Sequence, residues 1–166
     1  MKPLLVGDMP SRGGDKHWRT PLSGGVARLL CRIIGIPEQE ANRRWTAALY
    51  ERFDCTNAML RRRAWDLEQA SSELRTWLED EREVVVLLGT RAQEAYVRMT
   101  DPAESPVEWH SFYEWVVDPN SPTGRREVVV IPHLASFSRT GSMSRRAGRI
   151  LREAIDKARE MEETKL

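Results

Sequence analysis

The stretch Glu83-Val-Val-Val-Leu-Leu-Gly89 decides the fold, because a continuous β-branched and aliphatic run is typical of a parallel strand that is covered on both faces. Arg126-Glu-Val-Val-Val-Ile-Pro-His133 has the same character, and a shorter apolar run from Lys2 to Val6 predicts another buried strand. The mixed stretch from Arg52 to Met59 is too short for a helix and predicts a strand that ends near Asn57. The sequence therefore predicts four strands.

Helical patterns separate these strands. Ser23 is expected to cap a helix that stops at Gly35 and Pro37, and Pro37 is expected to start a second helix that runs to about Tyr50. Strands that alternate with helices predict an α/β fold, here a single domain over residues 1–166. Further helices are expected from about Ala64 to Asp80, from Thr90 to about Met99, and from about Ser144 onward.

The composition is that of an ordinary globular protein, with 40% hydrophobic and 31% charged residues among 166. No apolar run approaches the roughly 20 residues that cross a bilayer, so the chain is not expected to span a membrane. The first apolar run is interrupted at Gly7 and Asp8, which argues against a secretory signal and favours a cytoplasmic protein. Because the formal net charge is only +1, a nucleic acid would have to be held by a local basic patch.

Several common chemistries are disfavoured by spacing. Cys31 and Cys55 form no CxxC pair, and no histidine stands at a metal-ligand spacing from them, so neither a metal site nor a disulfide framework is indicated. Arg12 occupies the position where a GxxxxGK[ST] phosphate-binding loop needs its second glycine, and no GxGxxG motif occurs. A serine-hydrolase GxSxG elbow is also absent from the sequence. No cofactor is expected.

The residues that follow the predicted strands carry the functional signal. In an open parallel sheet, ligands bind beyond the carboxyl ends of the strands. Those ends carry Gly7 with Asp8, Asn57, Gly89 and His133. A carboxylate, a carboxamide and an imidazole are therefore expected to converge, and the glycines are expected to let a ligand approach the backbone closely.

The order of these motifs resembles the uracil-DNA glycosylase superfamily over most of the chain, roughly Leu4 to Arg149. The motifs that carry the resemblance are Leu5-Val-Gly-Asp-Met-Pro10, Pro21-Leu-Ser-Gly-Gly25 before a helix, Asn57, Val86-Leu-Leu-Gly89, and Ile131-Pro-His-Leu-Ala-Ser136 with Arg139. The resemblance implies a three-layer α/β/α sandwich around a central four-stranded, mainly parallel sheet. It also implies that Asp8 and His133 are the catalytic residues and that Asn57 reads the base edge.

Departures from the family pattern imply a divergent member. The iron-sulfur cysteines of one branch are absent, and Met9 stands where several branches carry a catalytic Asp or Asn. Leu22 replaces the Phe on which the base usually stacks, so the base is expected to rest on Leu22 with Trp18 or His17 supplying an aromatic surface. A wider pocket than uracil needs is one consequence.

A DNA-binding surface is expected around the last motif, where the family's intercalating apolar residue corresponds to Phe137. The arginines and serines near the start of the last helix are expected to face phosphates, because a helix N-terminus attracts anions. The residues expected to contact DNA are Phe137, Ser138, Arg139, Arg145 and Arg146. The run Arg61-Arg62-Arg63 is either a second phosphate clamp or a solvated face.

Together these observations lead us to expect a metal-independent, monofunctional DNA glycosylase that acts in base-excision repair. Its substrate would be uracil or a modified pyrimidine flipped out of single- or double-stranded DNA, and the protein is expected to be a monomer. Two alternatives remain open at this point. The same chemistry could act on a bulkier, hypermodified base, or the chain could be a catalytically silent DNA- or nucleotide-binding protein.

Overall fold

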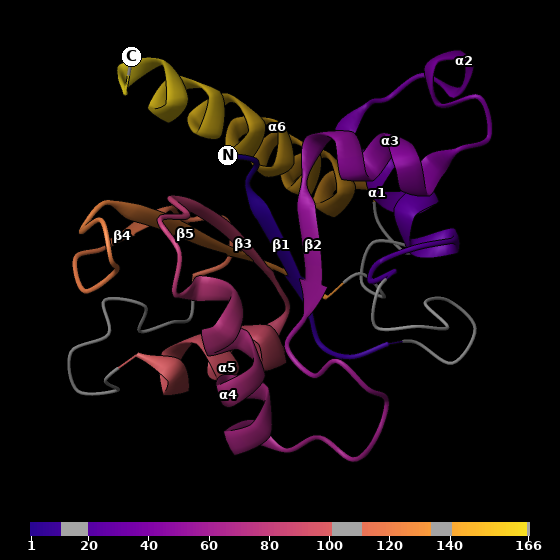
Figure 1. The fold of residues 1–166 in the computed structure, drawn as a ribbon. Coiled ribbons are helices and arrows are strands. Elements are labelled where there is room, and N and C mark those ends of the chain that lie inside the picture. Colours follow the sequence, from indigo (N-terminus) through magenta and orange to yellow (C-terminus); the bar gives the residue numbers. More distant parts are fainter. Residues whose placement is uncertain (11–19, 101–110, 134–140, 166) are drawn as a thin grey trace.

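A parallel sheet forms the centre of the molecule in the computed structural model, which describes residues 1–10, 20–100, 111–133 and 141–165 (Figure 1). The strand order is β2-β1-β3-β5-β4. The first four strands of that order are parallel, and β4 pairs antiparallel with β5 at the edge. The strands are β1 (Leu4–Gly7), β2 (Asp54–Asn57), β3 (Val84–Leu88), β4 (Val116–Asp118) and β5 (Arg126–Ile131).

Helices cover both faces of this sheet, so the predicted three-layer α/β/α fold is confirmed (Figure 1). On one face lie α1 (Gly25–Ile34), α3 (Trp45–Arg52) and the long α6 (Gly141–Thr164). On the other face lie α4 (Leu67–Leu78) and α5 (Thr90–Met99). The short α2 (Glu38–Ala41) precedes α3.

Two hydrophobic cores explain why the central strands are continuously apolar. Val84, Val86 and Leu88 of β3 pack in the core beneath α1, α3 and α6, whereas Val85 and Leu87 pack in the core beneath α4 and α5. Successive side chains of a strand point to opposite faces, so a strand covered on both faces needs apolar residues at every position. All five residues of β3 are buried.

The sheet has five strands, one more than expected. The additional strand, β4, is only three residues long, and its Val117 side chain is exposed. A strand this short at a sheet edge carries too few residues to show an alternating pattern. It lies between α5 and β5, a stretch of chain in which no strand was expected.

Two details of the expected helices are corrected, whereas α5 has the expected bounds, Thr90–Met99. Ser23 does not cap α1, whose N-cap is Gly24. The single helix expected from Pro37 to Tyr50 is broken into α2 and α3. The break lies at Asn42 and Arg43, which both have positive φ angles, a conformation that cannot continue a right-handed helix.

None of the helices in the described residues is long and apolar enough to cross a membrane.

Candidate functional site

The carboxyl ends of β1, β2, β3 and β5 lie along one edge of the sheet, as the order of strands requires (Figure 1). Gly7 at the end of β1 pairs with Asn57 at the end of β2, and Leu88 at the end of β3 pairs with Ile131 at the end of β5. Asp8 and His133 follow directly beyond this edge. The parallel register therefore brings together the acid, the amide and the imidazole that the sequence singles out.

Asp8 and His133 form the closest contact of this group. His133 Nε2 lies 3.5 Å from Asp8 Oδ2, which is too long for a good hydrogen bond but within the range of an ion pair. The Asp8 side chain is 15% exposed and that of His133 is 56% exposed. The carboxylate is therefore largely buried, whereas the imidazole beside it is open to solvent.

The second oxygen of Asp8, Oδ1, is buried and has no hydrogen-bond partner among the described residues. Buried carboxylate oxygens are almost always hydrogen-bonded, so an atom like this one marks a place where a water or a ligand donor fits. One oxygen of Asp8 thus faces His133 while the other remains open to a further donor.

The electrostatics of Asp8 are tuned by competing effects. Burial raises the pKa of the Asp8 carboxyl above its ordinary value, while the nearby His133 and Arg91 act in the opposite direction. Arg91 belongs to the first turn of α5, and its guanidinium lies 5.3 Å from the centre of the Trp65 ring. No sequence motif includes Arg91. Its position two residues after the strand-end glycine Gly89 is the only signal that points to it.

Gly7 provides room for Asn57. A Cβ atom at Gly7 would lie 2.5 Å from Asn57 Oδ1, which no real contact allows. Asn57 itself is 2% exposed, and the chain beyond it is tied to β1, since Ala58 and Met59 donate backbone hydrogen bonds to the carbonyls of Gly7 and Asp8. Gly7 thus accommodates a neighbouring side chain.

Gly89 provides room for His133 in the same way. Its φ angle is +93°, and a Cβ atom there would lie 3.2 Å from the Cβ atom of His133. The Gly89 amide also donates to the Ile131 carbonyl at 2.8 Å. Both strand-end glycines were expected to admit a ligand to the backbone. In the structure both glycines leave space that a neighbouring side chain of the site occupies, and ligand access stays a prediction.

Leu22 lies below this edge and is 5% exposed, with a φ angle of +56°. Its Cδ2 atom would be 2.9 Å from a Cβ atom at Gly7, so Leu22 is close to the Gly7–Asn57 pair. Leu22 therefore packs beside the residues at the carboxyl ends of β1 and β2, and a contact to a base stays a prediction. His17 and Trp18, the other two residues expected to contact a base, lie outside the described residues, so a pocket that includes them stays a prediction.

Arg145 and Arg146 lie on α6, and both side chains are exposed. The Arg146 guanidinium stacks 4.1 Å from the centre of the Tyr113 ring. A cavity of about 500 Å³ lies beside these two arginines. Its lining residues are Arg32, Ile33, Ser144, Arg145, Arg146, Arg149 and Arg152. The remaining residues expected to contact DNA, which are Phe137, Ser138 and Arg139, lie outside the described residues.

Tyr113 is a neighbour of the site that sequence reasoning left unassigned. Its amide donates to the Val130 carbonyl, which places it near the carboxyl end of β5. It has a φ angle of +71°, and its hydroxyl is buried without a partner among the described residues. The signal in the sequence was the aromatic cluster between Trp109 and Trp115, but nothing there distinguishes one ring from another.

No cluster of three or more histidine, cysteine, aspartate or glutamate side chains able to hold a metal ion occurs within the described ranges. The two cysteines are buried thiols, and burial raises the pKa of Cys31 to about 11. Neither cysteine belongs to the strand-end group. No protein-family model and no curated protein matches this chain.

Proposed function

We propose that this protein is a monofunctional DNA glycosylase that hydrolyses the N-glycosidic bond of uracil or a modified pyrimidine flipped out of DNA. The observation that carries the proposal is the strand-end group itself. Asp8 Oδ2 lies 3.5 Å from the exposed imidazole of His133, while the buried Asp8 Oδ1 has no partner among the described residues. The buried amide of Asn57 is at the end of the adjacent strand. In this proposal the enzyme acts as a monomer in the cytoplasm, in base-excision repair.

The chemistry of base excision requires two opposite charges to be stabilised close together. When the C1′–N bond breaks, its electron pair leaves with the base, and the sugar acquires oxocarbenium character. Water then adds to C1′ and gives up a proton. A carboxylate suits the sugar side of this reaction, and a hydrogen-bond donor suits the base side.

Asp8 is suited to the sugar side. Its carboxylate stabilises the positive charge, and its buried Oδ1 is able to accept a hydrogen bond from the attacking water and then its proton. Burial raises the pKa of Asp8, which makes the group a stronger base than an exposed carboxylate. Met9, which packs against the core on the α4 and α5 side, offers no second acid.

His133 and Asn57 are suited to the base side. The imidazole of His133 donates a hydrogen bond to the leaving base, whose negative charge grows as the bond breaks. Asn57 has a carboxamide that both accepts and donates, which matches the edge of a pyrimidine better than a carboxylate does. Its burial and close fit against Gly7 hold this amide in one place.

The substrate is proposed to be DNA because exposed arginines are concentrated on α6, the helix that follows β5 in the chain. Arg145 and Arg146, with Arg149 beside them, line a cavity on α6 whose positive charge suits phosphate oxygens. The resemblance of the motifs to the uracil-DNA glycosylase superfamily supports the same substrate. Leu22, an aliphatic residue where that family stacks an aromatic ring, favours a modified or larger pyrimidine over uracil alone.

An excision assay tests the proposal. Oligonucleotides that carry uracil, hypoxanthine or hypermodified pyrimidines are incubated with the protein, and abasic sites are revealed by alkaline cleavage. His133→Ala should lower the excision rate by about 100-fold or more, as loss of one donor to a developing anion does, and leave DNA affinity nearly unchanged. Asp8→Asn should also abolish most activity.

The matched control is Asp156→Asn, which removes an exposed carboxylate on α6 and should leave the rate unchanged. If His133→Ala excises at the wild-type rate, the histidine has no part in the reaction. If the wild-type protein releases none of these bases but still binds the oligonucleotides, the chain is a catalytically silent DNA-binding protein and the glycosylase proposal fails.

A further inference from the structure

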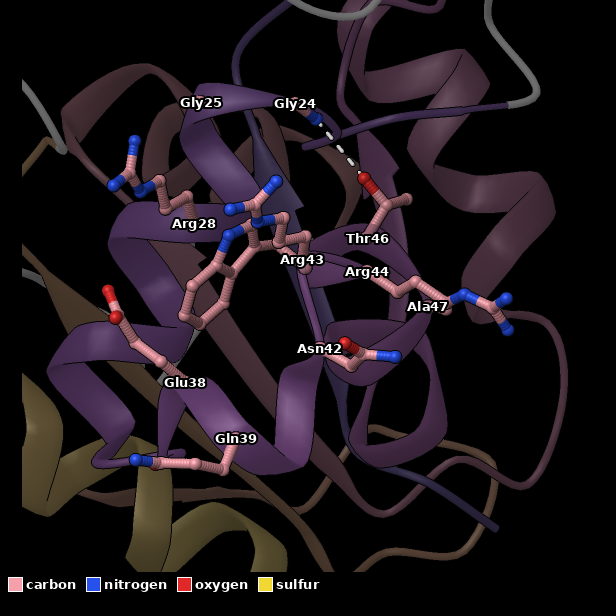
Figure 2. A pocket seen from close by; sticks show the side chains of 11 residues that line it. Gly24, Gly25, Arg28, Glu38, Gln39, Asn42, Arg43, Arg44, Thr46 and Ala47 are labelled. Atoms are coloured by element: carbon pink, nitrogen blue, oxygen red, sulfur yellow. Dashed lines mark hydrogen bonds between the residues drawn. The ribbon is translucent and has the colours of Figure 1, made fainter.

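A cavity of about 1040 Å³ lies on the α1 side of the molecule, between the start of α1 and the turn that joins α2 to α3 (Figure 2). None of the residues expected to act on a base lines it. Its described lining residues are Gly24, Gly25, Arg28, Glu38, Gln39, Asn42, Arg43, Arg44, Trp45, Thr46 and Ala47.

The walls of this cavity are fixed by local structure. The Gly24 amide donates a hydrogen bond to Thr46 Oγ1 at 3.2 Å, which ties the start of α1 to α3 (Figure 2). Asn42 and Arg43 have φ angles of +46° and +61°. Residues other than glycine rarely adopt this backbone conformation, which costs free energy of order 1–3 kcal/mol per residue. The turn that presents Arg43 is therefore held by its surroundings.

The charge of the cavity is positive. Arg28, Arg43 and Arg44 are exposed, whereas Glu38 is the one carboxylate among the described lining residues. That carboxylate already has a cationic neighbour, since Arg32 Nη2 lies 3.3 Å from Glu38 Oε1. Figure 2 shows Arg44 extending away from Arg28 and Arg43, so the latter two are the guanidinium groups best placed to share one anion.

An aromatic surface completes the lining. Trp45 is half-buried, with part of its side chain packed against the core beneath α1, α3 and α6, and it also lines the cavity. Arginines beside an aromatic ring are the combination that binds single-stranded nucleic acid, because a base stacks on the ring while guanidinium groups bind its phosphate. Each stacked base contributes about 1–3 kcal/mol.

The cavity is also close to the candidate active site. Leu22, which approaches Gly7 at the strand-end edge, is only two residues before Gly24 on the rim of the cavity. Two residues of chain span at most about 7 Å. A nucleotide bound in the cavity would therefore be a near neighbour of one whose base reaches Asp8 and Asn57.

We propose that this cavity binds an unpaired nucleotide of the strand that carries the target base, with its base stacked on Trp45 and its phosphate held by Arg28 and Arg43. The proposal rests on the proposed function for the identity of the ligand as DNA. It goes further by making single-stranded DNA the preferred substrate, because a base that stacks on Trp45 cannot at the same time be paired.

Direct binding tests this site apart from any chemistry. Fluorescence anisotropy measures the affinity of the full chain for a labelled thymidine-only single strand and for the same sequence as a duplex. The double variant Arg28→Ala/Arg43→Ala should bind the single strand at least about tenfold more weakly, with its salt dependence reduced by about 0.7 in log–log slope for each lost phosphate contact. Binding to the duplex should change much less. Arg75→Ala, an exposed arginine on α4, is the matched control and should bind both like the wild type.

The stacking partner is tested separately. Trp45→Leu should weaken single-strand binding about tenfold without changing the salt slope, and Trp45→Phe should keep most of the affinity because it keeps a ring. Thermal melting shows whether each Trp45 variant is folded, and the arginine variants, made at exposed positions, decide the question if Trp45→Leu does not fold.

Two outcomes overturn the inference. Unchanged single-strand affinity in the arginine double variant removes the cavity from DNA binding, and an equal loss on duplex and single strand shows a contact to a duplex backbone instead. Neither outcome affects the glycosylase proposal, whose test is excision by the wild type and by His133→Ala. Conversely, a protein that excises no base but loses single-strand affinity in the double variant would keep this site and lose the proposed reaction.

Discussion

Buried charged side chains occur at both ends of the parallel sheet, but their interactions differ between the two ends. At the amino ends of the strands, the buried charged side chains of Arg82, Glu83 and Arg126 each make at least one hydrogen bond or ion pair of 2.7 Å, although Arg82 Nε and Glu83 Oε2 have no partner among the described residues. At the carboxyl ends, Asp8 keeps a buried oxygen without a partner among the described residues and makes only a 3.5 Å contact to His133. A buried charge held by short hydrogen bonds contributes to stability, whereas one without a short hydrogen bond among the described residues is available for chemistry.

Arg126 shows how the amino end is held. It is 1% exposed at the start of β5, and its guanidinium donates to the carbonyls of Arg82 and Leu78 at 2.7 and 3.0 Å. Asp118 of β4 is the residue opposite Arg126 in the antiparallel register of β4 and β5. Its Oδ2 atom accepts a 2.5 Å hydrogen bond from the Tyr96 hydroxyl. Burial and this hydrogen bond raise the pKa of Tyr96, so the phenol remains a donor.

Arg82 extends the same arrangement to the other strands. Its side chain is 7% exposed, and Nη1 donates both to Asp54 Oδ2 at 2.7 Å and to the Lys2 carbonyl at 2.9 Å. One guanidinium thus joins the entry of β2 to the chain that leads into β1. The amino end fixes the positions of the strands, and this fixes where the residues at their carboxyl ends must meet.

The largest effect is expected at the amino end. Arg126→Met should lower the free energy of unfolding by about 2–6 kcal/mol, because it leaves the buried carbonyl groups of Leu78 and Arg82 without their donors. Urea unfolding measures the loss. The excision rate per folded molecule should change little, because Arg126 lies at the end of the sheet away from Asp8.

Arg98→Ala is the control for that measurement. Arg98 pairs with Glu68 at the surface, with both side chains at least half exposed, so its loss should cost about 0–1 kcal/mol. Equal losses for Arg126→Met and Arg98→Ala would mean that the buried arginine contributes no more than a surface one, and the contrast between the two ends would lose its basis.

A smaller effect, on both stability and excision, is expected at Gly89, which packs against the site residue His133. Gly89→Ala places a methyl group 3.2 Å from the His133 Cβ atom and puts alanine at a φ angle of +93°, a region that only glycine adopts easily. We expect a loss of about 1–3 kcal/mol in stability. We also expect a clear fall in excision, since a small displacement of a catalytic group is costly.

Gly141→Ala is the matched glycine substitution, because a Cβ atom there meets none of the described residues within 4 Å and its φ angle is not in the left-handed region. Stability and excision should both stay near the wild-type values in this variant. Wild-type excision in folded Gly89→Ala would show that His133 does not depend on Gly89 for its position.

The sequence predicted the fold where local patterns are strong. The aliphatic runs of β3 and β5 and the stop of α1 at Gly35, which adopts the left-handed conformation, follow from residue type alone. The break at Asn42 and Arg43 did not, because neither residue is a glycine or a proline and their positive φ angles arise from packing around them. Strand β4 was missed because its pairing with β5 is a tertiary contact.

The site was predictable to the level of topology. Parallel strands place their carboxyl ends together, so Asp8, Asn57 and His133 were expected at one edge. The 3.5 Å separation of Asp8 and His133 and the influence of Arg91 on Asp8 depend on how α5 and the strand ends pack. The close fit of Gly7 to Asn57 and of Gly89 to His133 was not predicted, because a sequence does not show which neighbouring side chain will need the space.

The smallest effect is expected in the pH dependence of stability at Asp8, at the carboxyl end of the sheet. Burial is the largest influence on Asp8 and raises its pKa in the folded protein, so the folded state binds the Asp8 proton more tightly than the unfolded state does. The wild-type protein therefore loses stability relative to Asp8→Asn as pH rises through the folded pKa of Asp8. Below the unfolded value of 3.8 the difference should be constant.

Urea unfolding of both proteins across acidic and neutral pH measures this difference, and the other titrating groups largely cancel because the two chains share them. Relative to the wild type, Asp8→Asn should gain stability between low and neutral pH, although it has lost its excision activity. Such a pairing, with less activity and more stability, is expected only where a charge is kept for chemistry at a cost to folding. An Asp8→Asn protein whose relative stability falls with rising pH would instead place Asp8 among the groups that hold the sheet together, as Arg126 does at its other end.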